Sequence, residues 1–331
     1  MSRYRMLAIA VLWLGVAAAF WSVLQRREQP LQRTRLLLGT VVEITVYDQR
    51  PQRFAPAVEA AFDEMSRLEA LTSFYRRDSD AARLSAMQGD LAVAPETLEI
   101  LAHGLEVGKA SGGAFDMTLG RLKVLWGFGS AHPRLPAPSE IEAALAASGQ
   151  GVLAVADGRV IKRTNAWIDL GGIAKGYIID RAVAVLKQAG VTCAAVNAGG
   201  DLRLIGQRAA AWRIGIRHPR QVDVLLATLV LKEPLAVVTS GDYERFFEQN
   251  GARYHHLFDP TTGMPAGRCQ SVTVVSRQAV WADALATAVF VLGPEQGLAL
   301  LERYPQTWGL IVAADGTTVV SPGLREQIAW P

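Results

Sequence analysis

The chain is poor in the residues that build disulfide and zinc frameworks. It has two cysteines, Cys193 and Cys269, in 331 residues. They are too far apart in sequence to form a zinc-binding pair, which disfavours a zinc site. Cys193 lies in the apolar run 191–196 and is expected to be a buried thiol. A disulfide between the two cysteines stays open, because the sequence does not give the distance between their Cα atoms.

A concentrated positive charge is also missing. Lys and Arg number 34 against 31 Asp and Glu, which gives a net charge of +3. Basic residues do not cluster among aromatic ones, so we expect no nucleic-acid binding. Half of the residues are hydrophobic and 20% are charged, a composition typical of a globular protein. The sequence has no internal repeat and no clear domain boundary after residue 35.

One long apolar run is present, at 6–24, and it follows two arginines. As a helix that rises ~1.5 Å per residue, it would be about 28 Å long, close to the hydrocarbon thickness of a bilayer. We therefore expect 1–27 to be an N-terminal membrane anchor or a signal peptide, with 17–19 as a small-residue cleavage site. The bulky Phe20 and Trp21 favour the uncleaved anchor.

Beyond this segment the patterns predict an α+β domain at 36–331, joined through a polar linker at 28–35. Apolar spacing of three and four predicts helices, and alternation predicts strands. The expected helices cover 57–71, 98–110, 140–147 and 177–189, and another opens at Trp281. The segment 36–47 is expected to be a strand or a hairpin, with Gly39 and Thr40 interrupting it. Further strands are expected at 152–156, 160–163, 167–170, 194–197 and 271–276, and an antiparallel set at 202–205, 212–217, 224–231 and 235–239.

The stretch from Asp169 to Asp201 carries the clearest chemical pattern. Asp169 is expected to end a strand, two glycines follow, and a helix opens with Lys175 in its first turn. Backbone N–H groups, the positive end of a helix and an ammonium would then point at one place, which suits a phosphate. The stretch lacks the spacing of a Walker P-loop, so this pattern alone does not establish nucleotide binding.

A second polar concentration lies on the helix that opens at Trp281. Asp283 and Thr287 are four residues apart, so their oxygens lie on the same side of that helix. A carboxylate and a hydroxyl are hard ligands that suit Mg²⁺, which keeps part of its shell for water and phosphate. The alternative is that Asp283 is only a helix N-terminal charge favoured by the dipole.

Aromatic residues in two glycine-rich or polar loops, 73–79 and 125–129, could stack on a planar ring, or could simply pack their own loops.

Seven separated motifs together resemble one family. They are GGAFDMT at 112–118, LWGFG at 125–129, DLGGIAKGY at 169–177, NAGGD at 197–201, TSGDY at 239–243, HLFDPTTG at 256–263 and ADALATA at 282–288. In this order they are similar to the ApbE family, the FAD:protein FMN transferases of the bacterial periplasm. The resemblance runs from about residue 36 to residue 310 and implies a mixed sheet core with flanking helices.

The resemblance also implies an activity. A threonine hydroxyl of an acceptor protein would attack the FMN-side phosphorus of FAD, AMP would leave, and FMN would stay on the acceptor through a phosphoester bond. Mg²⁺ would be held by Asp283, Thr287 and the Gly172 carbonyl and would neutralise the pyrophosphate. Ala286 stands where some relatives have an acidic residue, so there the metal would keep a water or use a backbone oxygen.

The family's motifs assign further residues. His256 would accept the threonine proton, since a neutral imidazole is a competent base near neutral pH. Its alternatives are a turn-capping role for His256 and a better-placed His255. Asp201 and Asp242 would orient ligands. The residues expected to contact FAD are Leu38, Tyr75, Ala114, Phe115, Asp116, Asp169, Lys175 and Leu257.

The expected partners are FAD, a threonine-bearing acceptor such as a membrane redox subunit, and the membrane itself. Many relatives are lipoproteins, but no cysteine precedes Cys193, which excludes lipid attachment. We expect the chain at the periplasmic face of a bacterial inner membrane, or in the periplasm if the segment is cleaved. Two alternatives stay open: an FAD pyrophosphatase that forms FMN and AMP, and a non-catalytic FAD-binding protein.

Overall fold

The computed structural model describes residues 29–130 and 132–331. The expected anchor or signal peptide at 1–27 lies outside these residues. Among the helices in the described ranges, none is both long and apolar enough to cross a membrane. The predicted α+β class, with a large sheet and flanking helices, is confirmed.

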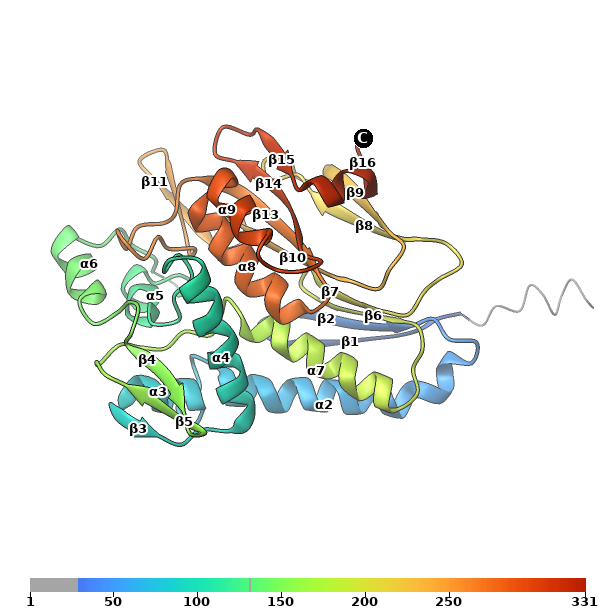
Figure 1. Cartoon of the computed structure of the whole chain (residues 1–331), viewed down its shortest axis with the longest axis horizontal. Coiled ribbons are helices and arrows are strands. Elements are labelled where there is room, and N and C mark those ends of the chain that lie inside the picture. The colour runs from blue at the N-terminus through green and yellow to red at the C-terminus, as the bar shows by residue number, and fades with distance from the viewer. Residues whose placement is uncertain (1–28, 131) are drawn as a thin grey trace, which may run out of the picture.

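The core is built on an eight-stranded sheet in which neighbouring strands are antiparallel. In spatial order its strands are β1 (Leu31–Leu37), β2 (Thr40–Val46), β6 (Ala194–Ala198), β7 (Asp201–Ile205), β10 (Ala236–Gly241), β13 (Cys269–Ser276), β14 (Trp308–Ala313) and β15 (Thr318–Val320). Three helices, α2 (Ala55–Thr72), α7 (Ala174–Gln188) and α8 (Ala279–Leu292), run along one side of it (Figure 1). Their apolar residues and that side of the sheet form the largest hydrophobic core.

The opposite side of the sheet is covered by a second, three-stranded sheet. It contains β8 (Trp212–Arg217), β9 (Leu225–Leu231) and β16 (Ile328–Ala329), and it encloses a second core with β7 and β14. The prediction that 202–239 forms one antiparallel sheet was therefore wrong in part. The strands were found, but β8 and β9 fold over the sheet that contains β7 and β10, because apolar residues of β7 face the second core as well as the first.

The remaining elements gather at the end of the molecule on the left of Figure 1. A small sheet and a separate hairpin lie among short helices there. They are α3 (Asp80–Ala86), β3 (Gly89–Leu91), α4 (Pro95–Ala110), α5 (Gly120–Trp126), α6 (Pro138–Leu145), β4 (Leu153–Ala156), β5 (Arg159–Lys162), β11 (Phe246–Gln249) and β12 (Ala252–His255). Helix α9 (Pro294–Leu301) instead packs on α8 and β14. Two 3₁₀ helices, η1 (Pro51–Phe54) and η2 (Pro322–Gln327), complete the set.

The N-terminal hairpin corrects the expected linker. Strand β1 begins at Leu31, so 31–35 belongs to the folded domain and not to a linker. The segment reads as polar because β1 is an edge strand with most of its side chains exposed; Arg35, for example, pairs with carboxylates on α2. Leu38 and Gly39 form the tight turn to β2 with φ of 57° and 68°, the left-handed pair that two-residue hairpins favour.

The predicted elements differ from the observed ones at two further places, the segment 167–170 and helix α5. The expected strand at 167–170 is an extended segment with only an isolated bridge between Leu119 and Trp167. Its backbone N–H groups bond elsewhere, as in Asp169 N to Met117 O at 2.8 Å. Helix α5, which ends at a left-handed Gly127, was missed because its glycine and aromatic neighbours resemble a loop. The other predicted helices and strands are present, with ends shifted by a few residues.

A third apolar cluster joins α5 to the hairpin β11–β12. Trp126 is fully buried, stacks on Phe128 at 5.9 Å and donates from Nε1 to the Gly263 carbonyl at 3.1 Å. Phe247 of β11 and Tyr254 of β12 pack on the same indole. The aromatics at 125–129 therefore pack mainly on one another and on this hairpin.

Candidate active site

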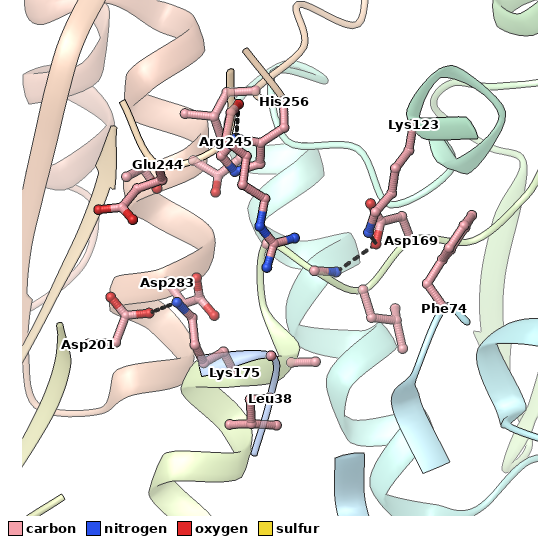
Figure 2. A pocket seen from close by; sticks show the side chains of 18 of the residues that line it. Leu38, Phe74, Lys123, Asp169, Lys175, Asp201, Glu244, Arg245, His256 and Asp283 are labelled. Carbon is pink, nitrogen blue, oxygen red and sulfur yellow. Dashed lines mark hydrogen bonds and ion pairs between the residues drawn. The ribbon is translucent and has the colours of Figure 1, made fainter. Parts of the chain in front are cut away.

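A cavity of ≈ 570 Å³ opens where the tip of the β1–β2 hairpin, the N-terminus of α7, α8 and the segment after β10 meet (Figure 2). This volume lies within the range of small-molecule sites. Its lining includes every residue expected to contact FAD, together with Gly172, His256, Asp283 and Thr287. The structure thus brings together residues that are spread over about 250 positions of sequence.

Asp283 is held by the first turn of α7. Its Oδ2 accepts the backbone N–H of Gly176 at 2.8 Å, and the side chain is 5% exposed. The N–H of Ala174 donates to the Leu170 carbonyl at 2.8 Å. The expectation that the N–H groups of this helix end cradle a phosphate is therefore wrong in part. The carboxylate of Asp283 occupies the helix end, where the dipole favours an anion.

Lys175 bridges two buried carboxylates. Its Nζ lies 2.6 Å from Asp201 Oδ2, and Asp283 lies nearby (Figure 2). Burial, followed by repulsion from Asp201, raises the pKa of Asp283 to about 7, although Lys175 and the Gly176 N–H act against this rise. Burial also raises the pKa of Asp201 against the pull of Lys175. A further cation beside Asp283 would relieve this repulsion.

The residues present fit a magnesium ion that also has phosphate oxygens among its ligands. The Thr287 hydroxyl makes no hydrogen bond within the described residues, and Gly172 approaches it so closely that a Cβ there would lie 3.2 Å from Thr287 Oγ1. No group of three His, Cys, Asp or Glu side chains in the described ranges could enclose a metal. One carboxylate, one hydroxyl and one carbonyl leave coordination positions for water and phosphate, as Mg²⁺ prefers.

Ala286 does not join this group. It is fully buried on α8 and lies outside the cavity lining. Because it lies inside the helix, its carbonyl is committed to the helical hydrogen-bond ladder. A metal contact through the backbone oxygen of Ala286 therefore stays a prediction, in which the metal would use the second lone pair of that carbonyl.

His256 lies in the cavity wall with its ring orientation fixed by Arg245. Its Nδ1 lies 3.3 Å from the Arg245 carbonyl, which also accepts the His256 backbone N–H at 3.2 Å. A carbonyl can only accept, so we assign the proton to Nδ1, which leaves Nε2 with a free lone pair. Burial, helped by the charge of Arg245, lowers the pKa of His256 to about 3, so the ring is neutral.

His255 is excluded as the reactive neighbour. Its Nδ1 accepts from the Leu257 backbone N–H at 3.3 Å, and its Nε2 lies 3.0 Å from the Ala266 carbonyl. The buried ring packs edge-on against Phe290 and does not line the cavity. Both ring nitrogens of His255 therefore have structural partners.

The wall opposite the Lys175 cluster carries a second ion pair. Lys123 of α5 donates to Asp169 Oδ1 at 2.8 Å and stands over the ring of Phe74 at 4.7 Å and of Tyr75 at 5.4 Å. Tyr75 is 69% exposed, so its ring can be covered by a planar ligand. Lys123 was not predicted as a site residue, because the helix that carries it, α5, was not predicted.

Asp116 and Asp242 play different parts. Asp116 Oδ1 accepts from the N–H and hydroxyl of Thr118, at 2.7 and 2.6 Å, and burial raises its pKa. Asp242 forms two hydrogen bonds with Arg220, at 2.7 and 2.6 Å, and lies outside the cavity lining. Asp242 thus fixes the β8–β9 loop to the segment after β10, and its expected part in orienting ligands stays a prediction.

Arg245 and Glu244 were also missed. Both line the cavity from the segment between β10 and β11. They directly follow the motif at 239–243, so the available signal was two opposite charges beside a turn that contains Gly241.

The comparisons with known proteins agree over nearly the whole chain. The ApbE family matches residues 38–311. A Treponema pallidum protein named FAD:protein FMN transferase is 34% identical over 91% of this chain and 90% of its own length. One of the same name from Vibrio cholerae is 33% identical over 92% and 94%.

Solved structures give the same result. The crystal structure of the ApbE protein from Thermotoga maritima superposes with a TM-score of 0.83 at 36% identity, over 90% of this chain and 99% of that one. The flavin transferase ApbE from Vibrio cholerae superposes with a TM-score of 0.81 at 30% identity, over 90% and 99%. With a family match over most of its length and relatives above 30% identity, the chain belongs to the ApbE family.

Proposed function

We propose that this chain transfers FMN from FAD to an acceptor protein. Relatives that carry the name FAD:protein FMN transferase share a third of their residues with it over nine tenths of its length. The observation in the structure that carries the proposal is one cavity with a neutral, free Nε2 of His256 on one wall and the Asp283–Thr287 pair on another. Phosphoryl transfer needs such positioning of a base and of charge-neutralising groups.

The reaction proposed for this site is a displacement at phosphorus. The hydroxyl proton of an acceptor threonine moves to His256 Nε2, and the oxygen forms a bond to the FMN-side phosphorus. The bond from that phosphorus to the bridging oxygen breaks, and the oxygen leaves with AMP. The Nδ1–H bond to the Arg245 carbonyl keeps the imidazole oriented while it carries the additional proton.

Mg²⁺ would be held by Asp283, Thr287 and the Gly172 carbonyl, and when bound it would neutralise pyrophosphate charge. Lys175, in the first turn of α7, also lines the cavity, and its positive charge adds to that neutralisation. Asp201 keeps the ammonium in place, so Lys175 does not need to reorganise when the leaving phosphate gains charge.

The proposed setting is the periplasmic face of a bacterial inner membrane, with the apolar run at 6–24 as the anchor, or the periplasm if that segment is removed. The acceptor would then be a membrane redox subunit that carries a threonine. This part of the proposal rests on the sequence alone.

The test uses the full chain in detergent with FAD and Mg²⁺, with and without a threonine-bearing acceptor. Release of AMP together with a fluorescent acceptor band supports transfer. Release of AMP without labelling supports the pyrophosphatase alternative, which the exposed rim at Tyr75 would permit by admitting water. Intact FAD in every arm contradicts both and leaves FAD binding alone.

Asp283→Ala sharpens this test. We expect turnover to fall by about 100-fold or more and to lose its Mg²⁺ dependence, because the only carboxylate of the proposed ligand set is gone. Asp63→Ala is the matched control, since that carboxylate is exposed on α2 and its one ion pair among the described residues is with Arg35. Unchanged turnover in Asp283→Ala would remove Asp283 from the metal site.

A further inference from the structure

Three cationic side chains of the described residues line the cavity, and only one of them lacks a partner. Lys123 is paired with Asp169 at 2.8 Å, and Lys175 is paired with Asp201 at 2.6 Å. The guanidinium of Arg245 makes no ion pair or hydrogen bond with any residue in the described ranges. The protein thus neutralises two of its cavity cations and leaves the charge of Arg245 for a ligand.

The Arg245 side chain extends across the cavity. It starts beside β11 and its guanidinium lies between the Lys175 group and the Asp169 group (Figure 2). Its Nη2 is 3.8 Å from the place that a Cβ would take at Gly39, in the tip of the β1–β2 hairpin. A ligand that fills the cavity must therefore pass next to this guanidinium.

The same residue also orients the proposed base. The Arg245 carbonyl accepts from the backbone N–H and Nδ1 of His256, at 3.2 and 3.3 Å. The Arg245 backbone therefore fixes both groups: it carries the guanidinium, and its carbonyl orients the ring that bears His256 Nε2. A phosphorus atom under attack near Nε2 lies within reach of the long Arg245 side chain.

A guanidinium at this place matches the charge that develops during the reaction. Its planar donors bind two phosphate oxygens at once. In phosphoryl transfer the charge spreads over the non-bridging oxygens of the transferred group. The proposed Mg²⁺ ligands Asp283 and Thr287 lie on α8, Lys175 lies on α7 and Lys123 lies on α5. Among the described residues, Arg245 is therefore the cation that the segment between β10 and β11 brings to the cavity for these oxygens.

We propose that Arg245 is a further catalytic residue, whose guanidinium binds the non-bridging oxygens of the FMN-side phosphate. This inference rests on the proposed function. Arg245 holds these oxygens while the threonine oxygen–phosphorus bond forms, the phosphorus–bridging oxygen bond breaks and AMP departs, with the hydroxyl proton on His256. It interacts more strongly with the transition state than with bound FAD, so it acts on the rate more than on affinity.

The test compares Arg245→Gln and Arg245→Lys with the wild-type full chain in detergent. The dissociation constant of FAD is measured without Mg²⁺ by flavin fluorescence, and kcat for acceptor labelling is measured at saturating FAD with Mg²⁺. For Arg245→Gln we expect kcat to fall about 100- to 1,000-fold and FAD binding to weaken by about 10-fold or less. Arg245→Lys should recover only part of the rate, because an ammonium cannot bind two oxygens in the same plane.

Arg253→Gln is the matched control. Its guanidinium also belongs to the β11–β12 region, but it stands over Phe246, pairs with Glu248 at 3.0 Å and does not line the cavity. We expect its kcat to stay within about 3-fold of wild type. A kcat loss in Arg253→Gln equal to that in Arg245→Gln would mean that the hairpin is merely disturbed, and would overturn the proposal.

The remaining outcomes are equally decisive. If Arg245→Gln keeps its kcat within about 3-fold, Arg245 is at most a ground-state contact and the proposal is wrong, whatever happens to the affinity. If Arg245→Gln does not fold, Arg245→Lys decides alone, and a fall in kcat of less than about 10-fold overturns the proposal. Failure of the proposed function has a different signature, since the wild-type chain would then label no acceptor and release no AMP.

Discussion

One added methyl group at Gly176 would test how the proposed metal site is held together. Gly176 lies in the first turn of α7, where its N–H binds Asp283. A Cβ at this position would lie 2.2 Å from the Ala279 carbonyl oxygen and 2.8 Å from Asp283 Cβ. Gly176→Ala therefore forces α7 and α8 apart at the point where the carboxylate is fixed.

Two effects oppose each other in this variant. Alanine favours a helix over glycine by about 1 kcal/mol. Overpacking costs about 1–3 kcal/mol, and here the obstacle is backbone that cannot rotate away. The contact to Ala279 is more than 1 Å short of the 3.4 Å at which ordinary van der Waals contact begins, so overpacking should win. We expect a net loss of up to about 2 kcal/mol in the free energy of unfolding.

The effect on activity should be larger. Separation of the helices moves Asp283 by about 1 Å relative to α7, and a misplacement of this size costs about 100-fold in rate. The measurements are urea unfolding followed by tryptophan fluorescence, and turnover of FAD as a function of Mg²⁺ concentration. We expect lower turnover and a higher Mg²⁺ concentration at half-maximal rate.

Gly104→Ala on α4 provides the control for this variant. Its added Cβ would meet the Met117 thioether at 2.3 Å, a flexible side-chain end that can rotate away. We expect turnover to stay within about 3-fold of wild type. If Gly176→Ala is instead more stable by about 1 kcal/mol and fully active, propensity alone decides and the close helix contact is refuted.

Two further predictions concern groups away from the cavity. Burial lowers the pKa of Lys162 to about 8, while its Nζ donates to the carbonyls of Ser85 at 3.2 Å and Ala166 at 2.7 Å. Its charge therefore destabilises the fold below pH 8, and stability rises from pH 8 to 10.5 because the unfolded chain then binds more protons. Lys162→Met should be the more stable chain in urea at pH 7.5, by up to about 3 kcal/mol, and the difference should shrink at pH 9.5; a pH-independent difference contradicts this. Cys193 and Cys269 are unpaired, and burial raises the pKa of Cys269 to about 12. Iodoacetamide at pH 8 should therefore label the partly exposed Cys193 alone in the folded chain and both thiols in urea, whereas a disulfide by mass spectrometry would refute this.

Most of the fold could be predicted where one face of an element is buried. Helix α8 has buried apolar residues over nearly its whole length, so its sequence shows a long apolar pattern. The β4–β5 hairpin turns at Asp157 and Gly158, which both have positive φ, and this residue pair is a recognisable turn signal. Only the last two residues of strand β1 fall within the strand or hairpin predicted at 36–47, because the rest of β1 has little burial pattern to detect. The segment at 167–170 alternates half-buried and buried side chains as a strand can, but it pairs with its neighbours only through one isolated bridge.

The candidate site was predictable in its members and not in their contacts. The motifs selected Asp283 and Lys175, and both line the cavity. The sequence assigned the helix end of α7 to a phosphate, whereas a carboxylate more than 100 positions away occupies it. Such a partner is set by tertiary packing, which local periodicity does not encode. Arg245 escaped notice for the same reason, since an unpaired guanidinium is recognisable only when its surroundings are known.

The cavity walls belong to units of different rigidity. Asp283 and Thr287 belong to α8, whose apolar residues are part of the largest core, whereas His256 and Arg245 sit at the ends of a two-stranded ribbon, a kind of element that is marginal without support. That ribbon is held largely by its aromatic contacts with Trp126. The enzyme therefore divides its tasks. The α8 wall keeps Asp283 and Thr287 in place, and we expect substitutions that loosen the ribbon to move His256 and Arg245 without any rebuilding of α8.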